Sequence, residues 1–378
     1  MTDTPRTDDA IYTLQQAAEA SFMAYGDDKL VETFGEYEAE YAVIRKGVGL
    51  LDLPQVGLIR VTGSDRADFL HRFVTNTVKT LAPGQANRSF LLTRAGRIAA
   101  DMIILAGEKE HLIILDRCDA GEVASQLDKF LFSEDVQFKN VSDDHRLLAL
   151  HGPQGAAVLN HLGAEKAHEL THGQSLNANL AGRSATVLRW DATGSMGFML
   201  VLSREDAAGA YQAIVDYFGG LLPDVEGGVR RSVTGRGIGW MAFNTARIEA
   251  GQALYHIDFG PDSLPHETNT IPQTVSFTKG CYLGQEIVAR MHNLGHPKKI
   301  LVGLAFKDDK LPLAGAAVLE ADGQTVIGAV TSSCLSPLAG NQAIALAMMK
   351  WGKHTEGTQV LVSAEGTQVP AQVRLLKL

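Results

Sequence analysis

The chain has 378 residues, more than the roughly 250–300 at which single hydrophobic cores stop growing, so two or three domains are expected. Hydrophobic residues make up 45% and charged residues 20%, the balance of an ordinary globular protein. The formal net charge of −9 argues against a general nucleic-acid binder, although it leaves open a local basic surface.

The cysteines and the start of the chain indicate where the protein works. Cys118, Cys281 and Cys334 are widely spaced and form no CxxC pair or Cys/His cluster, so we expect neither a disulfide framework nor a metal site. The first residues, MTDTPRTDD, are polar and lack the apolar core of a signal peptide. No run approaches the roughly 18 apolar residues of a membrane span. We therefore predict a soluble protein of a reducing bacterial cytoplasm, with no membrane or nucleic-acid partner.

The first part of the chain mixes strand and helix patterns. Residues 1–30 are predicted to be a polar leader followed by a short helix. Ser64 can cap a helix whose apolar residues recur at helical spacing, and a second helix is predicted to begin at Asp119. Pro83-Gly84 marks a turn. Strands are predicted at 56–61, 89–92, 98–105 and 111–115.

A second cluster of strands and helices begins near residue 147. The segment Ser203-Arg204-Glu205-Asp206 resembles a capping box, and a strictly periodic helix is predicted to follow it. Another helix is predicted at 156–162. Because hairpin-like strands alternate with helices here, the pattern favours an α+β fold over a purely parallel sheet. Strands are predicted at 147–150, 187–189 and 197–202.

After Pro297 the pattern changes to short strands separated by glycine, proline and charged turns. This is typical of a small all-β barrel or sandwich, and we place the domain boundary near residue 298. The strands are predicted at 300–306, 316–320, 325–330, 343–348 and 359–362.

The densest chemical pattern is Lys279-Gly280-Cys281-Tyr282-Leu283-Gly284-Gln285-Glu286. Cysteine reacts as the thiolate, and an ammonium two positions away favours that form. The glycines allow backbone conformations closed to other residues and let another chain approach. The alternative is a turn before a helix, with Cys281 as a small buried apolar residue.

Two carboxylates stand out among apolar neighbours. Asp101 lies near the start of an apolar strand, where it would suit proton transfer or contact with a ligand amine, unless it faces solvent at the strand end. Glu249 is costly to bury unless it accepts hydrogen bonds, and one natural partner is a heterocycle with paired N–H donors. A surface pair between Glu249 and Arg247 is its alternative.

Three other patterns carry weaker signals. Gly235-Arg236-Gly237-Ile238-Gly239 has alternating glycines but lacks the Lys-Ser/Thr of a phosphate-binding loop. His292 and His296 are four apart, but Gly295 and Pro297 weaken a shared helix, and two ligands make no metal site. Thr75-Asn76-Thr77 supplies small polar groups of the kind that often end a helix.

Together these segments resemble the folate-binding glycine-cleavage T-protein (aminomethyltransferase, GcvT) superfamily over nearly the whole chain. The matching segments are 43–53, Thr75-Asn76-Thr77, Gly96 to Asp101, Ala246 to Gly251 with Tyr255, and 328–332 with Ser336-Pro337. Lys279 to Glu286 is similar to the K-G-C-Y-x-G-Q-E motif of the superfamily's YgfZ branch, which acts in iron–sulfur cluster assembly or repair. The sequence departs from the T-protein pattern at Ala100-Asp101, where paired acids are common.

The resemblance implies a three-domain α+β ring that binds tetrahydrofolate in a central cavity, with a C-terminal β-barrel. The domains would be 1–145, the folate-binding region; 146–297, with which N-terminal segments can interleave; and 298–378. It also implies roles for particular residues. Cys281 and Asp101 would be catalytic, and the folate would contact Asp101, Glu249, Asn76, Tyr255 and Lys279.

Two functions therefore stay open at this point. One is a tetrahydrofolate-binding factor of iron–sulfur cluster assembly, with Cys281 as the working thiol and assembly proteins or client enzymes as partners. One cysteine cannot by itself hold a cluster that usually has four. The other is a one-carbon transferase that moves an aminomethyl or methyl group from an amine or sulfonium donor to tetrahydrofolate, with Asp101 and Glu249 orienting the reactants.

Overall fold

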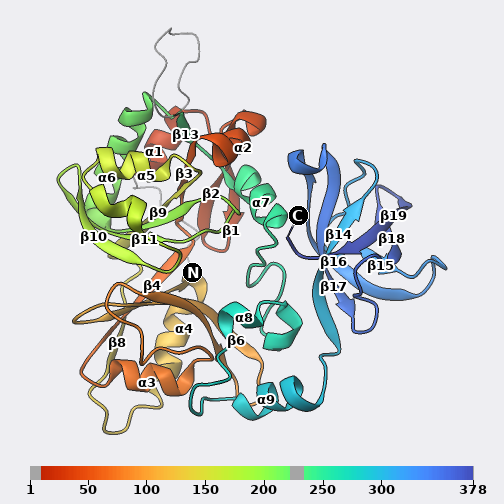
Figure 1. Cartoon of the computed structure of the whole chain (residues 1–378). Coiled ribbons are helices and arrows are strands. Elements are labelled where there is room, and N and C mark those ends of the chain that lie inside the picture. Colours follow the sequence, from red (N-terminus) through yellow and green to blue (C-terminus); the bar gives the residue numbers. More distant parts are fainter. Residues whose placement is uncertain (1–9, 222–233, 378) are drawn as a thin grey trace. The chain divides into compact units, whose positions relative to one another are not determined.

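A computed structural model of the chain describes residues 10–221 and 234–377 (Figure 1). The chain folds into two compact units that take alternating stretches of sequence. Unit 1 contains Met1–Arg66, Leu81–Ala86 and Ile103–Phe243, and unit 2 contains Ala67–Thr80, Asn87–Met102 and Asn244–Leu378. Each unit therefore forms only after segments distant in sequence have come together.

The largest sheet of unit 1 has six strands in the order β10-β11-β12-β9-β3-β13. Neighbouring strands are antiparallel except β13 and β3, which are parallel. Helices α1, α5 and α6 contribute buried side chains to the same core as this sheet. The bounds are β3 (Val48–Asp52), β9 (His145–His151), β10 (Ser175–Leu180), β11 (Arg183–Arg189), β12 (Gly197–Ser203), β13 (Gly235–Gly237), α1 (Ala10–Ala17), α5 (Gly155–His161) and α6 (Arg204–Phe218).

Helix α6 begins where the sequence predicts, after the capping residue Ser203. The Ser203 hydroxyl accepts a hydrogen bond from the Asp206 backbone N–H at 3.1 Å, and Gly219 ends the helix in the left-handed conformation. The glycines of β13 have a packing role, because a Cβ on Gly235 would lie 2.2 Å from the Phe218 ring and one on Gly237 2.8 Å from Phe34. Close packing against aromatic rings thus accounts for this glycine pattern.

A second sheet has the order β5-β6-β7-β4-β8, and the division between the units passes through β5 and β6. Helix α4 starts two residues before the predicted Asp119, because the Asp116 carboxylate caps it by accepting from the Cys118 N–H at 3.1 Å. The Ser64 hydroxyl, expected to cap α3, instead donates to Asp135 at 3.0 Å. The bounds are β4 (Val56–Thr62), β5 (Ala86–Leu92), β6 (Ile98–Ala106), β7 (His111–Asp116), β8 (Gln137–Asn140), α3 (Arg66–Phe73) and α4 (Arg117–Asp128).

The N-terminal region contains a hairpin that the sequence does not predict. The expected short helix is α1, and it is followed by β1 (Ser21–Tyr25) and β2 (Asp28–Thr33), which pair antiparallel. The predicted leader largely lies outside the described residues. Helix α2 (Tyr37–Lys46) and the 3-10 helix η1 (Glu165–Glu169) complete unit 1.

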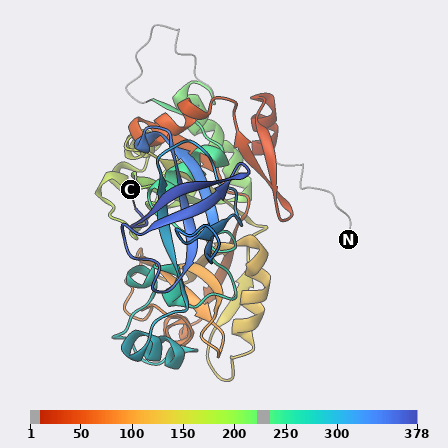
Figure 2. The same cartoon turned by 90° about the vertical axis from the view of Figure 1, so that its right-hand side faces the viewer.

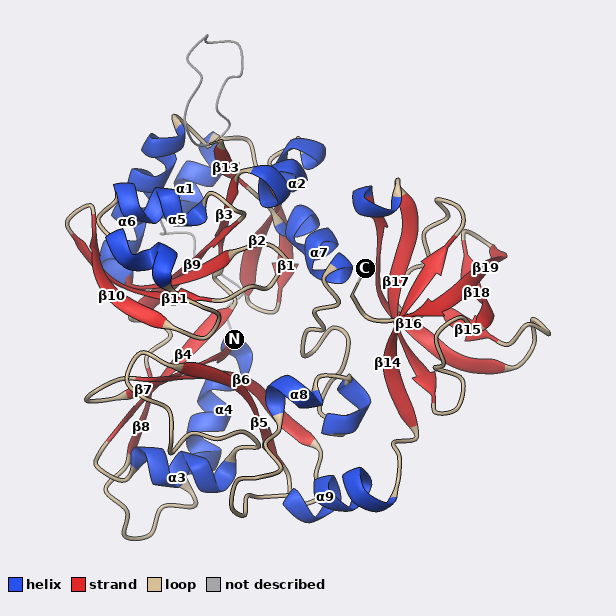
Figure 3. Cartoon of the chain, in the orientation of Figure 1, coloured by secondary structure: helices blue, strands red, loops and turns tan. Residues whose placement is uncertain are grey.

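Unit 2 ends in a closed barrel of six antiparallel strands, drawn in blue in Figures 1 and 2 and as red arrows in Figure 3. The order is β14-β17-β16-β15-β18-β19, and pairing of β19 with β14 closes it. Its interior is filled by aliphatic side chains. The bounds are β14 (Lys299–Phe306), β15 (Ala317–Leu319), β16 (Val326–Ser336), β17 (Gln342–Lys350), β18 (Gln359–Ala364) and β19 (Thr367–Arg374), with the 3-10 helix η3 (Pro337–Ala339) after β16.

The rest of unit 2 packs around a second core. Aromatic and aliphatic side chains from β5, β6, α7, α9, the barrel strands and the connecting segments form it, among them Phe90, Tyr255 and Tyr282. The helices are α7 (Trp240–Glu249), which the division between the units crosses, η2 (Pro265–Thr268), α8 (Ile271–Thr274) and α9 (Gln285–Leu294).

The predicted fold class is confirmed: the chain mixes helices with largely antiparallel sheets and carries a closed C-terminal barrel. The division into domains 1–145, 146–297 and 298–378 stays a prediction. Among the described residues, no helix is both long and apolar enough to span a membrane.

Candidate functional site

The first predicted site residue, Asp101, lies on β6 and is paired with an arginine that the sequence did not single out. Arg88 on β5 donates from Nε to the two Asp101 carboxylate oxygens at 2.8 and 3.1 Å, and from Nη2 to Oδ2. The two side chains are 15% and 11% exposed. A tight turn joins their strands, with the Thr93 N–H donating to the Arg97 carbonyl at 2.8 Å. Neighbouring strands thus hold a bidentate pair.

The Arg88 guanidinium is stabilised in its charged form. Burial alone would lower its pKa, but the negative charge of Asp101 and the hydrogen bonds between them outweigh burial, so the pKa of Arg88 is raised. Nη2 also donates to the Ala253 carbonyl at 3.2 Å. The pair is therefore a fixed ionic contact in a partly dry environment.

Asn76 lies in the segment after α3 and ties three pieces of unit 2 together. Its side-chain amide donates to the carbonyls of Arg88 on β5 and Gln273 on α8, both at 3.0 Å. The neighbouring Thr75 hydroxyl donates to the Thr274 carbonyl at 2.6 Å. Asn76 therefore does more than end a helix, since it fixes the backbone that carries Arg88.

Tyr255 contacts the strand that carries Asp101. Its hydroxyl lies 3.2 Å from each of the Ile98 and Ala99 carbonyl oxygens, to which it donates. The ring is buried and packs near Phe259, with centroids 5.6 Å apart. Tyr255 thereby fixes β6 two to three residues before Asp101.

Glu249, at the end of α7, is buried and held by the barrel. One carboxylate oxygen accepts from the Ser336 hydroxyl at 2.5 Å and from the Leu338 backbone N–H at 3.3 Å. The alternative prediction, a surface pair between Glu249 and Arg247, is wrong. Both side chains are buried, and Arg247 contacts Asp258 instead. The hydrogen bonds that a buried carboxylate requires come, at least in part, from the end of β16.

Arg247 and Asp258 form the most buried ion pair of unit 2. Their side chains are 1% and 0% exposed. A bulge in β16 after Val330 lets two successive hydroxyls reach the same carboxylate oxygen, Thr331 at 2.8 Å and Ser332 at 2.6 Å. The Leu254 N–H donates to the other oxygen at 2.9 Å. This network connects α7 to the barrel.

Lys279 caps the C-terminal end of helix α3, a role that the sequence did not indicate. Its ammonium donates to the carbonyls of His71 at 2.5 Å, Val74, and Asn76 at 3.1 Å. It also lies 5.0 Å from the centre of the Tyr282 ring. Carbonyls in the last turn of a helix have no partner within the helix, and a cation at that end is favoured by the helix dipole.

Lys279 makes stability depend on pH. Burial lowers its pKa to about 8 from the ordinary 10.5. Between these values the unfolded chain binds more protons than the folded chain, so the Lys279 contribution to the free energy of unfolding rises with pH through this window. Compared with Lys279→Met, the wild type should gain stability from pH 8 to pH 10 in urea titrations. A stability difference that stays constant over that range would contradict this assignment.

Gly284 shows why the motif needs a glycine. Its φ is +79°, and a Cβ there would lie 2.6 Å from the Thr93 carbonyl oxygen, in the turn between β5 and β6. The motif therefore packs directly against the turn that leads into the strand of Asp101.

We expect Gly284→Ala to lower the free energy of unfolding by about 2–3 kcal/mol, because it combines a left-handed backbone with overpacking. Gly280→Ala is the matched control, since nothing lies within 4 Å of a Cβ there, and it should cost less than about 0.5 kcal/mol. Chemical denaturation of the two variants measures the difference. Equal costs would contradict the packing role.

Cys281 is exposed and has a free thiol. Its neighbours in the motif have clear structural roles, since Lys279 ends α3, Tyr282 is buried in the core and Gly284 contacts the β5–β6 turn. The alternative in which Cys281 is a buried small residue is therefore wrong. No packing requirement accounts for the thiol.

The structure links four of the predicted residues, Asn76, Asp101, Tyr255 and Lys279, through hydrogen bonds. Asn76 bonds to Arg88 and Lys279, Arg88 to Asp101, and Tyr255 to the same strand as Asp101. Glu249 is bonded to the barrel instead. His292 and His296 do not share a helix, because α9 ends at Leu294, and each stacks on a different aromatic ring.

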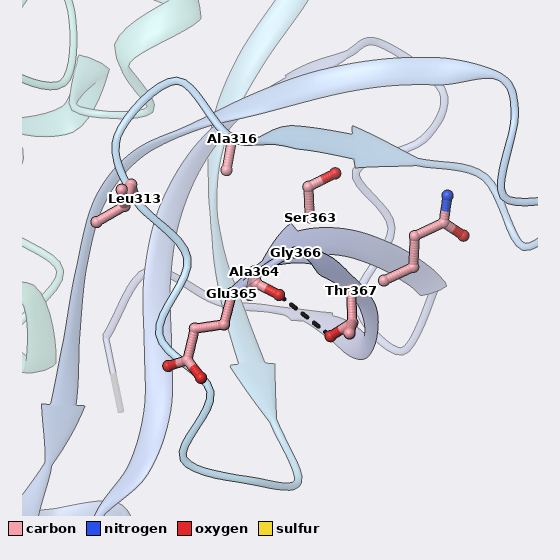
Figure 4. A pocket seen from close by; sticks show the side chains of 8 residues that line it. Leu313, Ala316, Ser363, Ala364, Glu365, Gly366 and Thr367 are labelled. Carbon is pink, nitrogen blue, oxygen red and sulfur yellow. Dashed lines mark hydrogen bonds between the residues drawn. The ribbon is translucent and has the colours of Figure 1, made fainter.

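A separate pocket of about 490 Å³ lies at the β18–β19 turn of the barrel (Figure 4). Its walls include Leu313, Ser363, Glu365 and Thr367, whose hydroxyl donates to the Ala364 carbonyl at 3.1 Å. None of the predicted site residues lines it. Its lining offers no thiol, imidazole or cationic side chain, so we assign it no chemistry.

Comparison with known proteins shows which families share this sequence and architecture. The GCVT N-terminal domain matches residues 11–279, and the glycine cleavage T-protein C-terminal barrel domain matches residues 299–378. An aminomethyltransferase of Saccharopolyspora erythraea is 27% identical, covering 96% of this chain and 95% of its own length. One of Halalkalibacterium halodurans is 28% identical, with 99% and 97% covered. The solved structure of the glycine cleavage system aminomethyltransferase T from Bartonella henselae superimposes with a TM-score of 0.83 at 25% identity, covering 97% of this chain and 96% of that one.

Proposed function

The chain belongs to the glycine cleavage T-protein family, and on that premise we propose that it binds tetrahydrofolate and transfers a one-carbon group to it, as an aminomethyltransferase does. The observation that carries the proposal is Asp101, a carboxylate fixed by Arg88 on two neighbouring strands within the matched N-terminal domain. The end-to-end similarity to curated aminomethyltransferases supports the same reaction class.

The proposed reaction needs no redox partner. An aminomethyl group on a thiol carrier gives its methylene carbon to two nitrogens of tetrahydrofolate. The C–S and C–N bonds of the donor break and two C–N bonds form. The two protons displaced from the folate nitrogens go to the carrier sulfur and to the departing ammonia. Such a reaction depends mainly on holding donor and acceptor in the correct orientation.

Each predicted folate-binding residue has a separate role in binding and orienting the reactants. The Asp101 carboxylate accepts a hydrogen bond from an N–H of the reacting amine. Because Arg88 fixes this carboxylate, Asp101 need not reorganise during the reaction. Glu249 contacts the pterin. Tyr255 fixes the strand that carries Asp101, Asn76 fixes the backbone of Arg88, and Lys279 holds the Asn76 carbonyl. The Ser336 and Leu338 bonds hold the Glu249 carboxylate in a fixed position.

The test is to incubate the purified protein with tetrahydrofolate and an aminomethyl-loaded lipoyl protein. Methylene-tetrahydrofolate should accumulate together with ammonia in equal amounts. If the protein binds tetrahydrofolate but forms neither product, the proposed transfer is rejected and the proposed folate binding stands. Absence of binding as well would reject the proposal.

A second function, iron–sulfur cluster assembly or repair with bound tetrahydrofolate, is favoured by one observation. Cys281 is exposed within the K-G-C-Y-x-G-Q-E segment, while the motif residues around it are used for packing and helix capping. In this alternative the thiol takes part in transient cluster or sulfur chemistry with client enzymes. In cells that lack the native gene, Cys281→Ala should fail to restore iron–sulfur enzyme activity. Full restoration would eliminate this function.

A further inference from the structure

Arg88 and Asp101 resemble a second bidentate arginine–aspartate pair of the described chain in geometry and burial. In the other, Arg146 donates to Asp52 from Nε at 2.7 Å and from Nη2 at 2.6 Å, and the side chains are 11% and 5% exposed. That pair lies in unit 1, where Gln15 also donates to Asp52 at 3.1 Å. Since geometry and burial are alike, the Arg146 pair is a reference for what such a contact does structurally.

Arg88 is itself held from several directions. Its Nη2 donates to the Ala253 carbonyl at 3.2 Å, and its own carbonyl accepts from Asn76 at 3.0 Å. Asp101 therefore faces a guanidinium that has little freedom to move. A carboxylate offers about four lone-pair positions, and the contacts with Arg88 use up to three of them, so at least one can accept an N–H from a ligand.

The pair also has no net charge. An isolated Asp101 carboxylate would attract any cationic group strongly, since charge interactions in a partly buried site are much stronger than in water. The adjacent guanidinium cancels most of that attraction. What remains is a hydrogen-bond acceptor in a fixed position, which distinguishes donors by their N–H groups more than by their charge.

We propose that Arg88 is a positioning and specificity-determining residue: it fixes Asp101 and cancels its charge, so that the site takes amine donors and rejects permanently cationic sulfonium donors. This inference rests on the proposed transfer to tetrahydrofolate and narrows its donor class. An amine donor offers an N–H to the remaining lone pair of Asp101. A sulfonium ion offers none, and it brings a charge that the neutral pair does not attract.

The substitution Arg88→Gln tests the specificity directly, because it leaves Asp101 uncompensated. Trimethylsulfonium ion is the probe, and its affinity is measured by calorimetry. We expect the variant to bind it at least tenfold more tightly than the wild type does, and the double variant Arg88→Gln with Asp101→Asn to lose that gain. A merely structural role for Arg88 predicts no such gain. Equal affinity in wild type and Arg88→Gln, including no binding by either, overturns the proposal.

Turnover of the amine donor provides the second measurement. Arg88→Lys keeps the charge but loses the bidentate geometry, so kcat should fall about tenfold with sulfonium still rejected. If Arg88→Gln does not fold, Arg88→Lys still tests whether Arg88 positions Asp101, since an unchanged kcat would overturn that role. Arg146→Gln, the matched control, should change stability without changing kcat or sulfonium affinity. If the wild type forms no methylene-tetrahydrofolate, the proposed reaction fails, while the sulfonium titration still decides the role of Arg88.

Discussion

Asp101→Asn should lower the rate of transfer to tetrahydrofolate by about 10²–10³-fold, the loss seen when one fixed electrostatic group is removed from an active site. The amide keeps the shape of the side chain but loses its charge and half of its acceptor capacity. Arg88 is then left with a weaker partner, so the free energy of unfolding should also fall, by about 2 kcal/mol. Initial rates with the aminomethyl-loaded carrier, together with urea titrations, measure both effects.

Asp52→Asn separates these two effects. It weakens the comparable pair with Arg146, so it should destabilise the protein to a similar extent and leave the rate unchanged. If both variants lost rate in proportion to stability, Asp101 would be a structural residue. If Asp101→Asn kept more than half of the wild-type rate, the proposed role of this carboxylate would be wrong.

The largest expected loss of stability follows from removing Asp258. Asp258→Ala leaves the Arg247 guanidinium buried without its ionic partner and removes the acceptor of the Thr331 and Ser332 hydroxyls. Breaking such a pair costs about 3–5 kcal/mol, because the remaining charge stays out of water. Chemical denaturation with tetrahydrofolate absent gives the value directly.

An exposed pair supplies the contrast. Lys79 and Asp68 lie 2.8 Å apart, but their side chains are 60% and 59% exposed, so Asp68→Ala should cost no more than about 1 kcal/mol. Replacing Arg247 and Asp258 together by Met and Leu should cost less than Asp258→Ala alone, since no charge is left buried. A loss below about 1 kcal/mol for Asp258→Ala would contradict the assignment of this network as the connection between α7 and the barrel.

Local patterns predicted most of the regular structure. The capping serine before α6 and the apolar periodicity after it are local signals that predict this helix. Strand β19 was missed because Pro370 argues against a strand, although alternate residues of this strand are buried in the barrel. The β1–β2 hairpin was missed because most of its residues are not fully buried and they show no clear alternation.

The site itself could be predicted only in part. Asp101 and Glu249 are conspicuous as carboxylates among apolar residues, but their partners depend on strand register and on the barrel. Arg88 carries no signal in the sequence, since its pairing with Asp101 arises only when β5 and β6 align. Lys279 was expected to act on Cys281, yet its ammonium bonds to a carbonyl 208 positions away. Contacts at such separations come from tertiary structure, and no local pattern reports them.

The most direct test of folate binding through Asp101 and Glu249 is a calorimetric titration with tetrahydrofolate. The wild type and Cys281→Ala should bind one equivalent with equal affinity. Asp101→Asn and Glu249→Gln should each bind at least tenfold more weakly, with the Asp52→Asn control unchanged. A titration without heat for the wild type, or equal affinity in all five proteins, would contradict the account.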